Sequence, residues 1–247
     1  MKSIVALVAL SLAMLVAGCS SSQQDSSSIT VFAAASLKST FTELGSRFEK
    51  DNPGTAVIFN FAGSSDLVTQ LTQGAPADVF ASADTKNMTR AAELVDGEPV
   101  DFATNTLTIV TAPGNPKGIK DFSDLSKPGT HVVVCAPQVP CGSATEKAEE
   151  ATGVTLTPVS EESAVTDVLG KVTSGQADAG LVYVTDAAAA GGKVTAIAFP
   201  ESADAVNTYP IAVLRDSTNP EAARRFVDLV TGPAGREVLA AAGFAAP

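Results

Sequence analysis

The chain of 247 residues has few of the side chains that build metal centres or contact nucleic acids. It contains one histidine and three cysteines, too few for a cluster of histidine and cysteine ligands around a metal. It has 16 basic and 27 acidic side chains, and the formal net charge of −11 argues against nucleic acid and anionic membrane surfaces as partners. An anion site in this chain would therefore have to act through local dipoles.

Motifs for nucleotide binding and for serine hydrolysis are also missing. No phosphate-binding loop, dinucleotide fingerprint or Gly-x-Ser-x-Gly elbow is present. His131 stands alone before an apolar run, which predicts a structural or surface role. Asp78 and Asp84 could suggest a carboxylate pair, but at a strand end and a helix start they are better interpreted as caps. The content of 45% hydrophobic and 17% charged residues is typical of a globular protein of one large or two modest domains.

The N-terminus has the pattern of an export signal. Lys2 precedes an apolar run over residues 4–17, which is too short to span a bilayer comfortably. The run ends in Leu15-Val-Ala-Gly-Cys19, which resembles the lipobox of bacterial lipoproteins. We therefore expect a signal peptide over residues 1–18, lipidation of Cys19 and a flexible tether over residues 19–28. The protein would be lipid-anchored on the outer face of the cytoplasmic membrane, or periplasmic; a plain signal peptide with a chance cysteine is the alternative.

The first segment after the tether predicts a strand, a turn of small residues and a helix. Residues 29–32 are β-prone, residues 33–35 are alanines, and an amphipathic stripe follows from Leu37 to Phe48. Ser36 falls at the start of this helix, in N-cap position, where free N–H groups and the helix dipole favour an anion. A serine there can also serve only as a cap.

A second segment repeats this pattern. Residues 55–61 predict a strand, and Ser64 follows small residues just before a helix that carries Leu67 and Leu71. Alternating strands and helices indicate βαβ units, in which ligands bind at the carboxyl ends of parallel strands. Two serines at two such ends can converge on one point, which capping alone would not predict.

The remaining elements continue the alternation, and no repeat of fixed period is present. Expected strands cover residues 78–81, 107–111, 131–135, 155–159, 178–184 and 209–214. Expected helices cover residues 85–95, a segment from about 142, residues 164–173, a short alanine-rich segment after 184, and residues 220–230 and 233–242.

Six segments together resemble one family. In order and spacing they are similar to segments of the molybdate/tungstate-binding proteins of ABC importers. The six segments are Val31-Phe-Ala-Ala-Ala-Ser36-Leu, Phe61-Ala-Gly-Ser64-Ser, Gly74-Ala-Pro-Ala-Asp78-Val-Phe-Ala-Ser-Ala-Asp84, Val139-Pro-Cys-Gly142, Gly180-Leu-Val-Tyr183 and Tyr209-Pro-Ile-Ala-Val. The resemblance implies the α/β, two-lobed periplasmic-binding-protein fold of type II, in which each lobe is a mostly parallel sheet flanked by helices. Lobe I would comprise residues 29–106 and 210–247 and lobe II residues 107–209. Two crossing segments, near residues 105–109 and 208–211, would join the lobes.

The resemblance also implies a ligand set. It places hydroxyl and N–H donors on Ser36 and Ser64, backbone N–H donors on Cys141 and Val165, and a hydroxyl donor on Tyr183. These residues would hold molybdate or tungstate as a tetrahedral oxyanion, with no cofactor. Cys141 stands where the family usually has a small residue such as alanine, and the Val165 position could be aligned one residue differently.

Export leaves Cys135 and Cys141 outside the reducing cytosol, with Cys19 taken by lipid. We predict that the two form a disulfide that fixes the backbone presenting the Cys141 N–H, provided that the loop brings their Cα atoms within about 7 Å.

The function implied is capture of molybdate or tungstate and delivery to an ABC importer permease and, indirectly, its ATPase. We expect a monomer that contacts the membrane only through its lipid, and not an enzyme. The alternatives are another small anion such as sulfate or an organic acid, and a serine hydrolase. An organic acid would call for an arginine clamp, which the site motifs lack, and the hydrolase would have to draw its histidine base from the other lobe.

Overall fold

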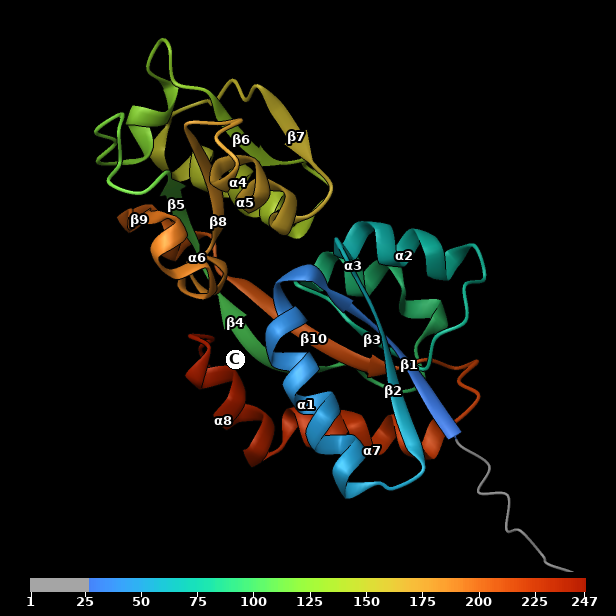
Figure 1. The fold of residues 1–247 in the computed structure, drawn as a ribbon. Helices are drawn as coiled ribbons and strands as arrows, with labels where there is room; N and C mark the ends of the chain where they lie inside the picture. The colour runs from blue at the N-terminus through green and yellow to red at the C-terminus, as the bar shows by residue number, and fades with distance from the viewer. Residues whose placement is uncertain (1–26) are drawn as a thin grey trace, which may run out of the picture.

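The computed structural model describes residues 27–247. The expected signal peptide, the lipidated Cys19 and residues 20–26 of the expected tether lie outside the described residues. The last two residues expected in the tether, Ser27 and Ser28, instead begin the first strand. Within them, two α/β lobes lie one above the other, and strands β4 and β10 lead toward the junction between them (Figure 1). None of the helices of residues 27–247 is long and apolar enough to cross a membrane.

The first lobe is built on a sheet of order β2-β1-β3-β10-β4. Its strands are β1 (Ser27–Ala34), β2 (Thr55–Ala62), β3 (Val79–Ala81), β4 (Val100–Asn105) and β10 (Asn207–Val213). Its helices are α1 (Lys38–Asp51), α2 (Ser64–Thr72), α3 (Thr85–Arg90), α7 (Pro220–Thr231) and α8 (Pro233–Ala241). Strand β1 runs parallel to β2 and β3, whereas β10 runs antiparallel to β3 and β4. The chain therefore returns from the second lobe into the middle of the first sheet.

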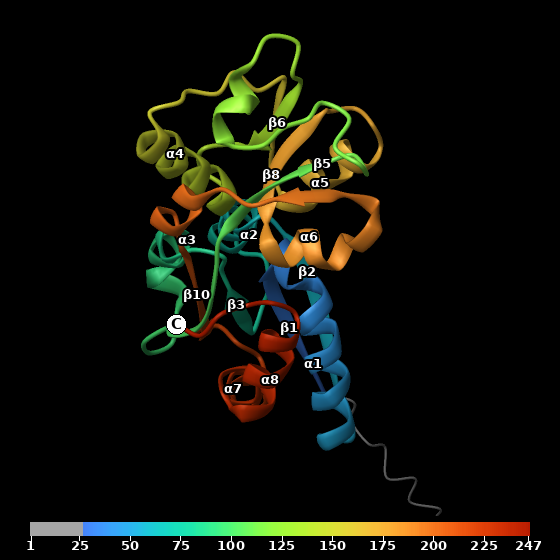
Figure 2. The same cartoon turned by 90° about the vertical axis from the view of Figure 1, so that its left-hand side faces the viewer.

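Alternation along β1 explains why helices cover both faces of this sheet. Val31 packs into a cluster with Phe41 of α1 and Phe226 of α7. Phe32 points to the opposite face and packs with Leu67 of α2. Successive side chains of a strand lie on opposite faces, so a strand that is apolar on both must be covered on both. Figure 2 shows α1, α7 and α8 gathered on one side of the sheet.

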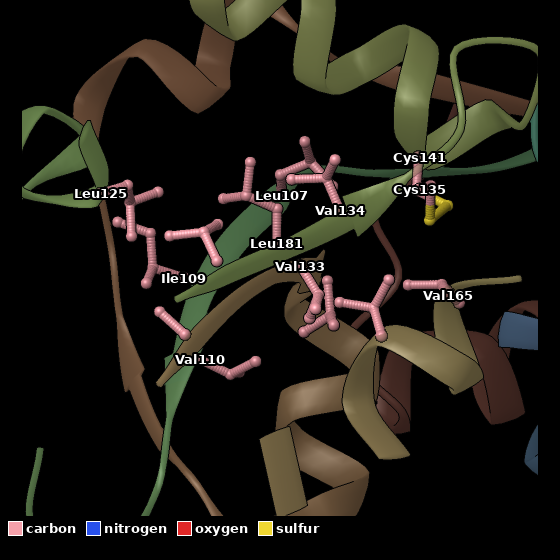
Figure 3. Close-up of a cluster of buried hydrophobic side chains, with 14 of the residues drawn as sticks. Leu107, Ile109, Val110, Leu125, Val133, Val134, Cys135, Cys141, Val165 and Leu181 are labelled. Carbon is pink, nitrogen blue, oxygen red and sulfur yellow. A yellow bond between two sulfur atoms is a disulfide. The ribbon is translucent and has the colours of Figure 1, made fainter. Parts of the chain in front are cut away.

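The second lobe is built on a sheet of order β7-β6-β8-β5-β9. Its strands are β5 (Leu107–Thr111), β6 (Val132–Cys135), β7 (Ser160–Glu162), β8 (Ala179–Tyr183) and β9 (Thr195–Ile197), and its helices are α4 (Pro140–Thr152), α5 (Val165–Thr173) and α6 (Val184–Ala190). β6 is parallel to β7 and β8, and β5 is antiparallel to β8 and β9. One apolar cluster fills this lobe and includes Leu107, Val133 and Leu181 (Figure 3).

Short 3₁₀ turns complete the chain at η1 (Ala35–Leu37), η2 (Ala92–Leu94), η3 (Phe122–Ser126), η4 (Gly191–Lys193) and η5 (Pro200–Asp204). The helix expected over residues 85–95 is divided into α3 and η2. The strand expected over residues 155–159 is wrong, because the strand that pairs with β6 is Ser160–Glu162. Pro158 within the expected segment has no N–H to donate to a ladder, and Val159 makes only one bond to the Val132 carbonyl.

Candidate anion-binding site between the lobes

A small cavity lies where the two lobes meet. Its lining comes from five residues of the first lobe and five of the second: Ala35, Ser36, Gly63, Ser64, Ala83, Val139, Pro140, Cys141, Val165 and Tyr183. All five residues that the sequence analysis expects at an anion site are among them. Within residues 27–247, no charged side chain belongs to this lining.

The sheet register explains why the two serines meet. Strands β1 and β2 are parallel, with Ala34 paired to Ala62, so both strands end at the same edge. Ser36 and Ser64 each follow two residues after that edge. In the second lobe, β6 and β8 are also parallel, and Tyr183 is the last residue of β8.

Helix N-termini converge on the cavity from both lobes. Ser64 is the first residue of α2, Cys141 the second of α4 and Val165 the first of α5. N–H groups in a first turn have no acceptor within their own helix, and the helix dipole adds partial positive charge there. The cavity can therefore stabilise an anion without a cationic side chain.

Ser64 is held by one specific contact. Its Oγ accepts a hydrogen bond from the backbone N–H of Ala83 at 3.0 Å, and the residue is buried. The N-cap of α2 is Gly63 rather than Ser64. The Ser64 hydroxyl therefore does not cap its helix, and its own hydrogen is left for the cavity.

Ser36 differs from the expectation that it caps α1. The chain enters α1 through the 3₁₀ turn of Ala35–Leu37, so Ser36 lies inside a helical turn and makes no side-chain capping bond. Its Oγ instead lies 3.1 Å from the Oη of Tyr209, with either atom able to donate. The interpretation of Ser36 as an N-cap is wrong, and the hydroxyl is free of any capping role.

Tyr183 carries the clearest sign of a missing partner. Its hydroxyl is completely buried, lines the cavity and has no hydrogen-bond partner among the described residues. A buried donor left unpaired costs about 1–3 kcal/mol, so such groups usually have a partner. Burial also raises the pKa of Tyr183 well above its usual value, which keeps the hydroxyl neutral and able to donate. The cavity is thus arranged for an acceptor.

A disulfide joins Cys135, at the end of β6, to Cys141, in the first turn of α4; the two Cα atoms are 5.6 Å apart. Figure 3 shows it at the edge of the apolar cluster, on the side of Val165. The loop it closes is tight, since a Cβ on Gly142 would lie 1.9 Å from the Ala136 carbonyl oxygen. The turn that presents the Cys141 N–H is therefore fixed both covalently and by close packing.

The two lobes are in direct contact around the cavity. Asn207 donates from Nδ2 to the carbonyl of Ala83 in the first lobe (2.8 Å) and to that of Pro140 in the second (3.3 Å). Gly63 approaches the second lobe so closely that a Cβ there would lie 1.9 Å from the Ser163 carbonyl oxygen. The structure therefore shows the lobes closed on one another.

The two aspartates serve the fold. Asp84 caps α3 by accepting from the Asn87 N–H at 2.8 Å, as expected. Asp78 accepts from the N–H groups of Thr30 (2.7 Å) and Thr218 (2.9 Å), so it ties β1 to the loop before α7. Neither carboxylate lines the cavity.

His131 lies at the surface, with Nδ1 3.7 Å from the Asp178 carboxylate. It does not line the cavity, so it supplies no base to either serine. In the part of the chain that the structure describes, no group of three or more His, Cys, Asp or Glu side chains could hold a metal ion.

Sequence reasoning missed three cavity features. Gly63 and Ala83 line the cavity, and Tyr209 supports Ser36 from behind the lining. Gly63 and Tyr209 appeared in the quoted motifs only as turn and strand residues. The glycine directly before a candidate site serine was the available signal for the close approach; for Tyr209 only the fold shows the contact.

Two lobes that close over a cavity at their interface are the architecture of a solute-binding protein. The chain belongs to the bacterial extracellular solute-binding proteins, whose family model matches residues 29–245. Members of this family bind solutes, so the chain is a binding protein and not an enzyme, and the occupant of the cleft is a ligand rather than a cofactor.

Curated relatives and solved structures agree with this assignment. The chain is 58% identical to the molybdate-binding protein ModA of Mycobacterium tuberculosis, over 95% of both chains. It is 35% identical to the protein of that name from Escherichia coli, over 89% of this chain and 90% of the relative. The Azotobacter vinelandii periplasmic molybdate-binding protein superposes with a TM-score of 0.77 at 22% identity, covering 89% of this chain and 99% of that one. The two-lobed fold of type II is thereby confirmed.

Proposed function

We propose that the protein captures molybdate, and also tungstate, outside the cytoplasm and delivers it to an ABC importer. The oxyanion would be held by Ser36, Ser64, Cys141, Val165 and Tyr183. The observation that carries the proposal is the buried Tyr183 hydroxyl, which has no hydrogen-bond partner within residues 27–247, in a cavity of helix N-termini that no charged side chain of those residues lines. The names of the 58% and 35% identical relatives support the choice of molybdate.

The proposed contacts are neutral donors to a dianion. Hydrogen bonds to a charged group contribute about 1.5–3 kcal/mol each, and the low dielectric of a closed cleft strengthens them. Because the donors come from both lobes, only the closed form satisfies the ligand completely, and binding favours closure. Molybdate and tungstate should bind more tightly than the smaller sulfate, whose oxygens would fall short of a ring of donors set for the larger ions.

Delivery requires a permease and, indirectly, its ATPase. We propose that the protein acts as a monomer, with lobe I comprising residues 29–106 and the chain from β10 onward and lobe II the residues between them. The expected boundary at residue 210 falls inside β10 (Asn207–Val213), which belongs wholly to the first sheet. Lipidation of Cys19 would keep it at the outer face of the cytoplasmic membrane. A relative named as a putative ABC transporter substrate-binding lipoprotein in Bacillus subtilis, 28% identical over 97% of this chain, supports this anchoring.

Sulfate is the second candidate ligand. A sulfate-binding protein of Synechococcus elongatus is 27% identical over 93% of this chain, and the two anions share charge and tetrahedral shape. The same donors could serve either one, so size decides between them.

Calorimetric titration of the chain from Ser20 onward with molybdate, tungstate, sulfate and phosphate tests the proposal. We expect tight binding of the first two ions and weak binding of the others. Displacement of molybdate by sulfate at comparable concentration would show a general oxyanion site, and failure to bind molybdate would overturn the proposal.

A further inference from the structure

The side-chain contacts between the two lobes share one chemical type. Within residues 27–247, each side-chain hydrogen bond from one lobe to the other is donated by an asparagine amide of the first lobe. None of the ion pairs of these residues crosses between the lobes. The donors are Asn87 of α3, Asn105 at the end of β4 and Asn207 at the start of β10. Closure therefore gains neutral hydrogen bonds rather than ion pairs.

Two of these amides reach the same loop of the second lobe. Asn87 donates from Nδ2 to the carbonyl of Gln138 at 3.3 Å. Asn207 donates from Nδ2 to the carbonyl of Pro140, also at 3.3 Å. Both carbonyls lie in residues 135–141, the disulfide loop. Figure 1 shows α3 on the side of the first lobe that faces the second. The disulfide loop is thus held from the first lobe at two places.

The direction of both bonds is fixed by the groups around them. A backbone carbonyl can only accept, so the amide nitrogen of each asparagine must face the loop. At Asn87 the Asp84 carboxylate oxygens lie 3.0 and 3.1 Å from the same nitrogen, and the Arg90 guanidinium donates to the amide oxygen at 2.8 Å. At Asn207 the second acceptor is the Ala83 carbonyl, at 2.8 Å. Turning either amide over would set oxygen against oxygen.

Each of the two amides also has a partner that does not depend on closure. Asp84 and Ala83 belong to the first lobe, so they hold the two nitrogens in place when the lobes are apart. The bonds to the disulfide loop are then gained on closure, and opening leaves neither asparagine without an acceptor. A donor that is oriented before the contact forms loses little conformational freedom when it forms.

We propose that Asn87 and Asn207 are positioning residues for the oxyanion: on closure they hold the disulfide loop from the first lobe and so direct the Cys141 N–H toward the ligand. Neither asparagine lines the cavity, so both act through the loop. Pro140, which accepts from Asn207, directly precedes Cys141. This inference rests on the proposed function, because the direction of the Cys141 N–H matters only if the cavity binds an anion.

Calorimetric titration of Asn87→Ala, Asn207→Ala and the double variant with molybdate tests the inference. Both bonds are longer than the usual length of about 2.9 Å. Each substitution should therefore lower the affinity about two- to fivefold, the lower part of the range for a neutral hydrogen bond, and the double variant should lose about 4- to 25-fold. Asn60→Ala is the matched control, because the Asn60 amide donates to Gln70 within the first lobe, and it should bind like wild type.

A second background distinguishes this role from support of the first lobe alone. In Gly63→Ala a Cβ would collide with the Ser163 carbonyl oxygen, so the lobes should not close fully. There the double asparagine substitution should change the affinity by less than about twofold, because its contacts with the disulfide loop are already lost. A loss of affinity as large as in the original background would overturn the inference. Thermal unfolding of each variant without ligand checks the fold.

Hydrogen exchange of the backbone amides of residues 136–142 reports on the loop directly. Saturating molybdate should slow this exchange in wild type, and should slow it less in the double variant. Equal slowing, or a double variant that binds within about twofold of wild type, overturns the inference and leaves molybdate binding intact. If wild type binds sulfate but not molybdate, the proposed ligand is wrong, and the same measurements with sulfate test the asparagines. A wild type that binds no oxyanion overturns both.

Discussion

Gly63 offers a way to separate lobe closure from the ligand contacts. Its backbone angles, φ −60° and ψ 141°, are open to any residue, so alanine introduces no local strain. The obstacle to a side chain lies in the other lobe, where a Cβ would meet the Ser163 carbonyl oxygen at 1.9 Å and the Val139 Cγ1 at 3.6 Å. Gly63→Ala should therefore leave the open protein intact and prevent the closed one.

The size of the effect follows from the clash. A carbon cannot approach a backbone oxygen to 1.9 Å, so the lobes must stay apart by about 1 Å or more at this point. A hydrogen bond lengthened by that amount from about 2.9 Å is no longer a hydrogen bond. If the ligand keeps the donors of one lobe and loses two from the other, at about 1.5–3 kcal/mol each, the affinity should fall between about 10² and 10⁴-fold.

Calorimetry with molybdate measures the affinity, and small-angle scattering with saturating ligand reports whether the variant becomes compact. Gly170→Ala is the matched control, because a Cβ there meets nothing within 4 Å. It should bind like wild type. Thermal unfolding without ligand should stay close to that of wild type for both variants, since exchanging glycine for alanine costs at most about 1 kcal/mol at the N-cap position of Gly63 and stabilises by about 1 kcal/mol inside a helix, where Gly170 lies.

The result that refutes this reasoning is a Gly63→Ala protein that binds molybdate within about threefold of wild type, a difference well below the loss of one donor. Such affinity would mean that the lobes bind ligand without the contact between Gly63 and Ser163. Loss of binding with a collapsed unfolding temperature would instead indicate damage to α2.

Three further outcomes are expected. Ser64→Ala should weaken molybdate binding by about 1.5–3 kcal/mol without abolishing it, because the backbone N–H remains; calorimetry showing wild-type affinity would contradict its role. Burial raises the pKa of Asp186 to about 7, so the folded state holds this proton more tightly than the unfolded chain and the unfolding free energy falls as pH rises from about 4 to about 7. Asp186→Asn should remove the part of this decrease in unfolding free energy that comes from Asp186, and urea unfolding between about pH 4 and pH 7 measures it. Replacing Cys135 and Cys141 by serine should lower the unfolding free energy by about 2–3 kcal/mol and reduce ligand affinity. If the variant and wild type are equally stable in denaturant, the disulfide does not stabilise the fold.

Local sequence patterns predicted most of the helices and strands. The stripe of Phe41, Leu44 and Phe48 predicted α1 correctly, because all three face the first core. Strand β4 was not anticipated, since Val100 and Asp101 are exposed and the segment becomes a strand only by pairing with β10. Non-local pairing of this kind leaves little trace in a short sequence window.

The site was predictable to the extent that it depends on strand ends. Ser36 and Ser64 were expected to converge because parallel strands end at one edge, and the register of β1 and β2 places them there. The partners of their hydroxyls were not predictable. Ala83 lies 19 residues from Ser64 and Tyr209 lies 173 residues from Ser36 along the chain, and the pairing of β1, β3 and β10 in the first sheet brings them into contact.

The position of β10 constrains the order in which the protein can fold. The strands of the second sheet, β5 to β9, are contiguous in the chain between residues 107 and 197, whereas the first sheet needs residues 207–213 between β3 and β4. In a chain that emerges N-terminus first, β4 stays unpaired until the residues of the second lobe and of β10 have followed. The second lobe can therefore be complete before the first, and a chain truncated ahead of Asn207 would retain five paired strands in one lobe and only β2-β1-β3 in the other.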